Sequence, residues 1–99
     1  MDPFNYSATN PLDEVQVLFA TRKLQKQESL ETSLKCINLL LSMSSSTSHR
    51  LLLANNPDLQ VLTTLREVLV SAEAGLDATF MGLASKTCLN LSIPKENSG

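Results

Sequence analysis

The sequence SLKCINLLLSMS at residues 33–44 contains apolar residues at the spacing of an α-helix. Leu34, Ile37 and Leu41 fall on one helix face, with Leu40 beside them. The middle of this stretch, INLLLSM, is apolar almost all round, and a helix of that kind is normally buried on more than one side. We therefore predict a buried helix over residues 29–44.

Four further helices are predicted around this one from the same kind of pattern. They begin at Asn10, near His49, at Pro57 and at Asp77. The first carries a stripe that ends at Leu24, and the other three cover residues 49–54, 57–73 and 77–92. The apolar residues are mostly leucine, with only four aromatic residues in the chain, which favours helices over strands. The sequence therefore predicts an all-α fold with five helices.

The expected helix ends follow from local chemistry. Asn10 is a suitable N-cap, and Pro11 suits the first helical position. Gly75 can end the helix over 57–73 in the left-handed conformation. Leu76 and Met81 stand at the two positions of a hydrophobic staple at the start of the last helix. Residue Pro94 forbids continuation of that helix.

These boundaries divide the chain into three parts. Residues 1–9 are expected to form a flexible N-terminal arm, residues 10–93 the helical domain and residues 94–99 a polar tail. The Ser-rich stretch at 44–48 should separate two helices, because hydroxyl side chains compete for backbone hydrogen bonds.

Charge indicates a protein partner. Ten acidic and eight basic residues give a net charge of −2, which supplies no long-range attraction for nucleic acid or an anionic membrane. Arg22, Lys23 and Lys26 form the one basic cluster, which we interpret as a solvated helix face. We expect neither direct nucleic-acid binding nor membrane association. No apolar run is long enough to span a bilayer, and the N-terminus has no secretion signal.

No catalytic, metal or cofactor site is predicted. His49 is the one histidine, and nothing in the sequence places it beside Cys88 as a base for a nucleophile. Cys36 and Cys88 lack CxxC spacing, so we expect small core residues in a reduced, intracellular protein. Glycine-rich phosphate loops are absent, and Gly82 is expected to permit close helix packing.

Two pairs of segments suggest an internal repeat. EVQVL at 14–18 matches DLQVL at 58–62, which lies 44 residues later. CINL at 36–39 matches CLNL at 88–91, which lies 52 residues later. The longer shift requires about eight extra residues, which the segment around 71–75 can hold. Periods in the low-to-middle forties with two or three helices per unit are typical of armadillo and HEAT arrays. The pattern predicts a short right-handed armadillo-like stack of about two repeats, with an ordinary helical bundle as the alternative.

Three segments then resemble a known family. SLKCINLLLSMS (33–44), HRLLLANNPDLQVLTTL (49–65) and LASKTCLNLSIPKEN (83–97) look like the armadillo-type region of SWI/SNF and RSC chromatin-remodelling subunits. Those proteins often carry an AT-rich interaction domain, which this chain lacks. The sequence departs from the family pattern by inserting Lys95 and by having Leu89 in place of a basic residue. The resemblance implies a scaffold role in a nuclear remodelling complex.

The same resemblance suggests candidate binding residues. In armadillo proteins, asparagines of the third helix often line a groove for an extended peptide, and Asn90 resembles that position, with Lys86 one turn earlier. Asn38 and Lys35 complete the candidate set. The alternative is that each amide caps a neighbouring loop or helix end. Peptide binding in a transport or adhesion adaptor is therefore the second functional hypothesis.

A stack of two units is expected to be incomplete. Repeat proteins usually need three or more units, because each unit buries its apolar face on a neighbour. We expect the helices over 29–44 and 77–92 to expose apolar surface. A partner protein, other subunits of a complex or a second copy of the chain would cover it.

Overall fold

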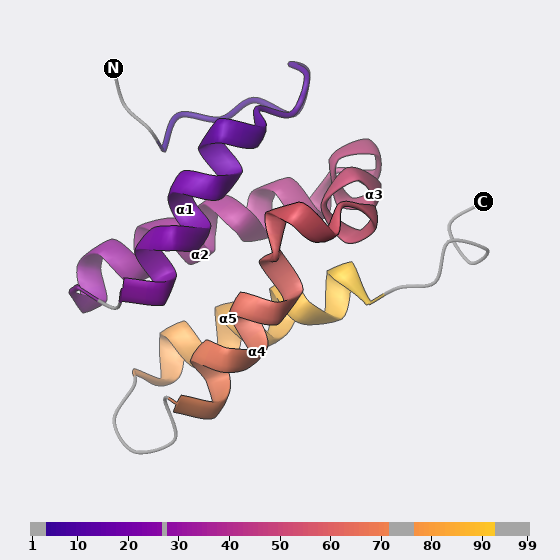
Figure 1. Ribbon diagram of the computed structural model, residues 1–99. Helices are drawn as coiled ribbons and strands as arrows, with labels where there is room; N and C mark the ends of the chain where they lie inside the picture. The colour runs from indigo at the N-terminus through magenta and orange to yellow at the C-terminus, as the bar shows by residue number, and fades with distance from the viewer. Residues whose placement is uncertain (1–3, 27, 72–76, 93–99) are drawn as a thin grey trace.

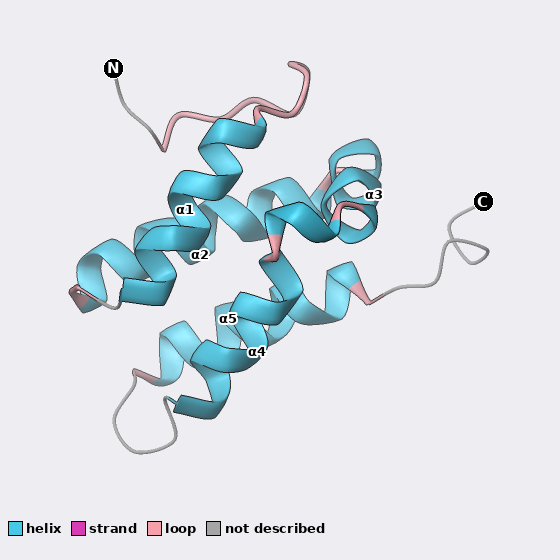
Figure 2. Cartoon of the chain, viewed as in Figure 1, coloured by secondary structure: helices cyan, strands magenta, loops and turns pink. Residues whose placement is uncertain are grey.

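A computed structural model describes residues 4–26, 28–71 and 77–92. This part of the chain contains five α-helices, one short 3₁₀ helix and no strand (Figure 2), which confirms the all-α prediction. The elements in chain order are α1 (Glu14–Lys26), α2 (Leu30–Ser45), α3 (Thr47–Asn55), η1 (Pro57–Leu59), α4 (Val61–Ser71) and α5 (Ala78–Leu91).

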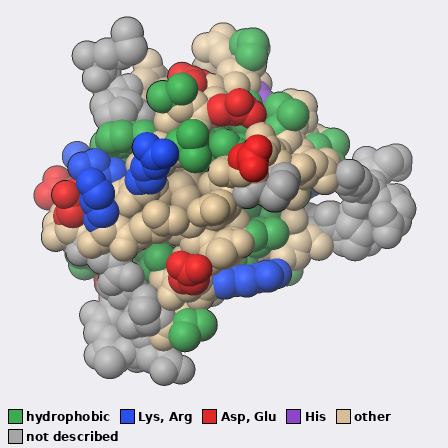
Figure 3. Space-filling view, viewed as in Figure 1, with side chains coloured by type: hydrophobic (Ala, Val, Ile, Leu, Met, Phe, Trp, Pro, Cys, Tyr) green, Lys and Arg blue, Asp and Glu red, His purple; other side chains and the backbone are tan. Residues whose placement is uncertain are grey.

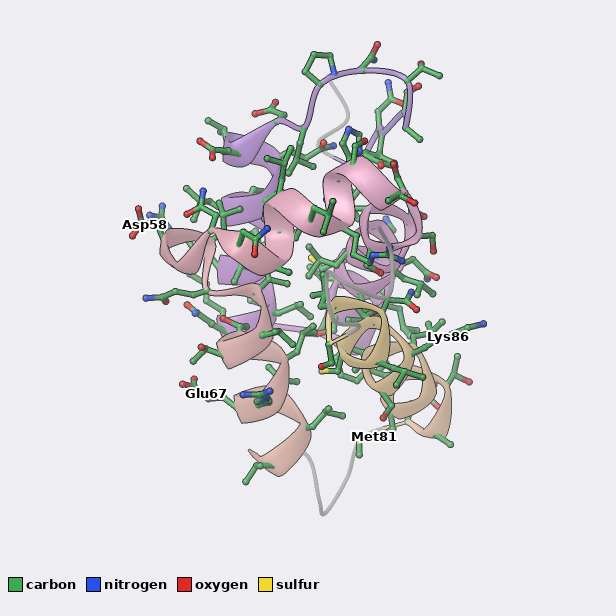
Figure 4. The ribbon with its side chains drawn as sticks, turned by 90° about the vertical axis from the view of Figure 1, so that its right-hand side faces the viewer. Asp58, Glu67, Met81 and Lys86 are labelled. Atoms are coloured by element: carbon green, nitrogen blue, oxygen red, sulfur yellow. The ribbon has the colours of Figure 1, made fainter. Side chains whose placement is uncertain are left out.

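The four longer helices lie in two layers. Helix α1 packs beside α4, and α2 packs beside α5, while each of the pairs α1/α2 and α4/α5 joins one layer to the other (Figure 1). Seen from the side, α1 and α4 occupy one half of the molecule and α5 the other (Figure 4). Helix α3 contacts α2, α4 and α5, so it covers one end of both layers.

The core lies around α2. This helix contacts α1, α3 and α5, which confirms that it is buried on more than one side. Fully buried side chains reach the core from α1, α2, α4 and α5, and the largest are Phe80, Leu24, Ile37, Leu40, Met43 and Leu65. Because α2 is largely covered within the chain, little of the apolar surface that it was expected to expose is present. Leu30, at its first turn, is its one strongly exposed large apolar side chain.

Two predicted helix starts are confirmed. The Ser29 hydroxyl accepts a hydrogen bond from the Thr32 backbone N–H at 3.2 Å, at the start of α2. The Asp77 carboxylate accepts one from the Thr79 N–H at 3.1 Å, at the start of α5. Both side chains satisfy backbone donors that have no partner inside the helix.

The predicted start of the first helix is wrong. Helix α1 begins at Glu14, and Asp13 caps it, with Oδ1 accepting from Val15 N at 3.0 Å. Asn10 is engaged elsewhere through its backbone. Its N–H donates to Ser7 O, and its carbonyl accepts from His49 Nε2 at 2.8 Å. Because the Asn10 carbonyl is bonded to His49, Asn10 does not begin a helix.

The segment before α1 packs against the helices, although a flexible arm was expected there. The Phe4 and Phe19 rings meet edge to face with centroids 5.7 Å apart. The Gln16 side chain donates to the Asn5 carbonyl at 2.6 Å. Phe4 and Tyr6 both pack on the buried core, so residues 4–10 belong to the folded unit.

The helix expected over residues 57–73 is divided. The side-chain Oδ1 of Asn56 accepts a hydrogen bond from the Asp58 N–H at 3.1 Å. The backbone carbonyl of Asn56 accepts one from the Leu59 N–H at 3.2 Å, and this bond closes the turn of η1. Gln60 then has φ = 54°, in the left-handed region, so α4 starts only at Val61. Residues 72–73 lie outside the described residues, as do Gly75, Leu76 and Pro94, on which other expected helix signals fall.

The Ser-rich stretch at 44–48 breaks the chain at one position. Helix α2 continues to Ser45 and α3 starts at Thr47, so Ser46 alone separates them. Helix α3 therefore begins two residues earlier than expected, before His49.

Gly82 does not serve close packing. A Cβ added there would meet nothing within 4 Å, and the residue lies on the exposed side of α5. The prediction was wrong because the α5 face that meets its neighbours is formed by Phe80, Ala84, Thr87 and Leu91.

The two proposed repeat matches differ in how well the burial of their aligned residues agrees. With the shift of 44 residues, four buried positions of α1 fall on four buried positions of α4, namely Val17/Val61, Ala20/Thr64, Thr21/Leu65 and Leu24/Val68. With the shift of 52 residues, buried Ile37 falls on Leu89, which is 68% exposed. Leu39 and Leu91, which the same shift aligns, are both buried, so the burial pattern repeats fully between α1 and α4 and only in part between α2 and α5.

Candidate interaction surface

Among the residues that the structure describes, five large apolar side chains are exposed, one on each α-helix. They are Val15, Leu30, Leu52, Val70 and Leu89. Val15 of α1 is 75% exposed and Leu52 of α3 is 53% exposed, and these two line the same shallow cavity. Exposed apolar side chains are common singly, so their grouping is the informative feature.

Three adjoining cavities form a continuous surface over α3 and α1. The first is lined by Ser48, Leu51, Leu52, Asn55 and Asn56. The second, of about 370 Å³, shares Leu52 and Asn56 with it and adds Leu12, Asp13, Glu14 and Val15. The third, of about 470 Å³, shares Val15 and adds Leu18, Phe19, Arg22, Lys23 and Lys26. We call the residues of these three cavities the α1–α3 surface.

One end of the α1–α3 surface is basic. Lys23 Nζ lies 3.0 Å from Glu28 Oε1 and 5.8 Å from the Phe19 ring centroid. The hydrogen bond from Lys23 lowers the pKa of the Glu28 carboxyl. Figure 3 shows Lys and Arg side chains gathered beside apolar ones on the face of the molecule that it presents.

The middle of the surface is acidic, but its carboxylates have partners. Asp13 caps α1 through the Val15 N–H, and Glu14 Oε2 accepts from Asn56 Nδ2 at 2.9 Å. The contact between Glu14 and Asn56 links α1 to the end of α3. Both helices also pack on η1 and α4, so their relative position rests on that packing as well as on this exposed bond.

A part-buried polar cluster joins the segment before α1 to α3. His49 Nδ1 hydrogen-bonds the Tyr6 hydroxyl, and His49 Nε2 bonds the Asn10 carbonyl. A carbonyl can only accept, so Nε2 carries the proton and, in the neutral ring, Nδ1 accepts from Tyr6. A tyrosine hydroxyl is protonated at neutral pH and can donate, and burial raises the pKa of Tyr6 further. Sequence reasoning missed this cluster because its members are about 40 residues apart.

The predicted site residue Asn90 contacts a neighbouring helix. Its Nδ2 donates to Ser44 Oγ at 3.1 Å, and Ser44 in turn donates to the Leu41 carbonyl. The side chain of Asn90 is half-buried. The Asn90 amide thus joins α5 to a side chain of α2, whereas the alternative interpretation expected it to cap a neighbouring loop or helix end.

The other predicted site residues lie in two places. Asn38 donates to the Leu34 carbonyl of its own helix at 3.0 Å. Lys35 lies 3.7 Å from Glu31 and 5.8 Å from the Phe4 ring centroid. Asn38 and Lys35 do line one cavity of about 340 Å³, together with Phe4, Tyr6, Leu39 and Ser42. Lys86 is exposed and points away from the helices (Figure 4).

The two cysteines differ in environment. Cys36 is fully buried, as predicted, and burial raises the pKa of its thiol from 9.0 to about 11. Cys88 is half-buried, and burial raises its pKa against the opposing effect of Arg66. A raised pKa leaves little thiolate at neutral pH, and the thiolate is the reactive form. The hydrogen bonds of both His49 ring nitrogens go to Tyr6 and Asn10 and not to a thiol.

The described part of the chain contains no group of three or more His, Cys, Asp or Glu side chains that could hold a metal ion. None of the helices in these same residues has the length and apolar character to cross a bilayer.

Comparison of the chain with protein families, with curated proteins and with solved structures found no match. The likeness to chromatin-remodelling subunits therefore rests on the residues quoted for it above.

Proposed function

We propose that this chain is a non-catalytic protein–protein interaction module that binds its partner through the α1–α3 surface. The grouping of Val15 and Leu52 on one cavity supports the proposal most directly. Each large apolar side chain that a partner covers contributes about 1 kcal/mol or more when its exposed area leaves water. Charged groups at the border of such an apolar patch then select the partner.

The proposed setting is a nuclear chromatin-remodelling complex, in which the chain would act as a scaffold subunit. The resemblance of residues 33–44, 49–65 and 83–97 to armadillo-type subunits suggests this setting. An armadillo-like stack is in keeping with the two helix layers and with the shared burial pattern of α1 and α4. A module of this kind would be intracellular and would use the contacts of its subunit neighbours for stability.

Paired substitutions test the proposed surface. The variant Val15→Glu with Leu52→Glu places two charges on it, whereas Val70→Glu with Leu89→Glu places two charges at similarly exposed sites elsewhere. Tagged chains would be purified from cells of the source organism and their bound proteins quantified by mass spectrometry.

We expect the first variant to lose its specific partners by about tenfold or more and the control to retain them. Circular dichroism must show both variants folded. Equal recovery of partners with both variants would contradict the proposal, and partners outside chromatin-remodelling complexes would contradict the proposed setting.

The second candidate function is binding of an extended peptide. The cavity that Asn38 and Lys35 share with Phe4 and Tyr6 favours it. Substituting Lys35 and Asn38 by Ala, and separately Lys86 and Asn90 by Ala, would remove partner binding if this function is correct. If the α1–α3 surface is the binding site, both of these variants will retain the partner.

A further inference from the structure

The basic end of the α1–α3 surface combines an apolar ridge with cations on one helix. Val15, Leu18 and Phe19 are spaced i, i+3, i+4 and line a cavity of about 470 Å³. Residues at this spacing lie on one helix face, and Arg22 and Lys26 continue the same face over the next two turns. Leu18 and Phe19 are half-buried, while Val15 is strongly exposed. A ridge of this shape suits the groove of a second helix.

The charge of this end is opposite to that of the whole chain. The net charge of the chain is −2, yet Arg22, Lys23 and Lys26 all line this one cavity. Lys23 is paired with Glu28. Within the part of the chain that the structure describes, Arg22 and Lys26 make no ion pair and no side-chain hydrogen bond. The charge of Lys26 also lowers the pKa of the Glu28 carboxyl, but both Arg22 and Lys26 are exposed at the border of the apolar ridge.

We propose that the occupant of this cavity is an acidic amphipathic helix of another protein. Its apolar side chains would cover Val15, Leu18 and Phe19, and its carboxylates would pair with Arg22 and Lys26. This inference rests on the proposed function and specifies the chemistry of the partner. Opposite charges at the border fix the register of such a helix and exclude basic competitors.

Other occupants fit this cavity less well. In a two-fold pairing of copies, each copy uses the same patch, so cations would approach cations. The nearby carboxylates of Asp13 and Glu14 could offset that repulsion, but they already bond Val15 N–H and Asn56. Nucleic acid and anionic lipid need a stronger positive field than a chain of net charge −2 provides.

The test uses the full chain and a designed peptide as the probe. The peptide has about 18 residues, with Leu at i, i+3, i+4 and i+7 and mainly Glu between them, and carries fluorescein. One control peptide has the same composition in scrambled order, and a second has Lys in place of Glu. Binding is measured by fluorescence anisotropy from about 50 to about 500 mM NaCl.

Two charge-reversal variants are compared. Arg22→Glu with Lys26→Glu alters the cavity, and Arg66→Glu with Lys86→Glu alters exposed cations that do not line it. Each exchange changes the charge by −2, so both variants reach −6 and differ only in position. Neutral Arg22→Gln with Lys26→Gln provides a second form of the cavity variant if charge reversal disturbs folding.

We expect the acidic peptide to bind the natural chain and to lose affinity at high salt. The cavity variants should weaken it by about tenfold or more, and the Arg66/Lys86 variant by less than about threefold. The Lys peptide should bind the Arg22→Glu, Lys26→Glu variant more tightly than it binds the natural chain. That reversal would identify the cavity itself as the site.

Several results would overturn the inference. These are equal binding of the scrambled peptide, equal weakening by both variants, or a dimer of the natural chain that the cavity variant dissociates. Binding of phosphatidylserine vesicles or of a short oligonucleotide through Arg22 and Lys26, without peptide binding, would overturn it as well. If Val15→Glu with Leu52→Glu still abolishes partner recovery while the acidic peptide fails to bind, the proposed function survives and this inference alone fails.

Discussion

Burial of Cys36 links the stability of the fold to alkaline pH. The pKa of its thiol is raised from the ordinary value of 9.0 to about 11 in the fold, because burial disfavours the thiolate. Between these values the unfolded chain loses a proton that the folded chain keeps. The contribution is fully present below pH 9 and is lost as the pH rises toward 11, by up to about 2 to 3 kcal/mol.

Urea unfolding from about pH 8 to about pH 11 measures this effect. The natural chain should lose stability more steeply with pH than a Cys36→Ala variant, and the difference isolates this thiol from Cys88 and Tyr6. Identical slopes for the two chains would mean that Cys36 is accessible to water in the fold.

A substitution at Gly82 is expected to increase the stability of the fold. Its position in α5 is helical and open, with nothing within 4 Å of an added Cβ. Gly82→Ala should therefore raise the free energy of unfolding by about 0.5 to 1 kcal/mol, because Ala loses less conformational freedom in a helix. Thermal unfolding measures this increase. Ser85→Ala, at an exposed position of the same helix, serves as the control and should have a smaller effect. Destabilisation would show that another element packs on this face.

Residue identities predicted some environments and not others. The aliphatic character of Ile37 and Leu40 is enough to predict a buried face. The contact of His49 with Tyr6 could not be predicted, because nothing local in either sequence segment refers to the other. Likewise, the sequence indicates that a buried Asn90 amide would need a hydrogen-bond partner. It does not indicate that this partner is Ser44, because only the packing of α5 on α2 brings the two residues together.

At the scale of elements, two residues, Asp13 and Asn10, can be compared as caps of α1. Asp13→Ala should lower the free energy of unfolding by about 1 kcal/mol, because it leaves the Val15 N–H without its acceptor. Asn10→Ala should cost less, since the hydrogen bonds that the structure gives Asn10 use its backbone. Urea denaturation of both variants measures the difference. A larger loss of unfolding free energy for Asn10→Ala would indicate that Asn10, and not Asp13, caps the first helix.

Helix existence was predictable for all five segments, while some boundaries were not. Ser29 and Asp77 cap their helices through bonds to N–H groups two or three residues away, so the signal is local. Asn56 and Pro57 carry the same kind of signal, but a 3₁₀ turn and left-handed Gln60 follow them. Capping chemistry shows where a helix can start, and competing tertiary contacts decide whether it does.

At the scale of the whole molecule, the packing of α2 changes where a partner is expected. The sequence indicated that apolar surface would remain on the helices over 29–44 and 77–92. In the structure, α1, α3 and α5 cover α2, and the grouped apolar side chains lie on α1 and α3 instead. Helices α1 and α3 are brought together by η1 and α4, which both of them contact, and by the bond between Glu14 and Asn56, which joins segments 42 residues apart. Periodicity alone could not place them together.

The most direct test of the α1–α3 surface is site-specific photo-crosslinking in cells of the source organism. A benzophenone amino acid would replace Val15 or Leu52 on the surface, and Lys86 or Leu89 on α5; all four positions are exposed. We predict that adducts with another protein form on illumination from Val15 and Leu52 and not from Lys86 and Leu89. Adducts confined to the α5 positions, or none from either set, would contradict the proposal that α1 and α3 carry the partner-binding surface.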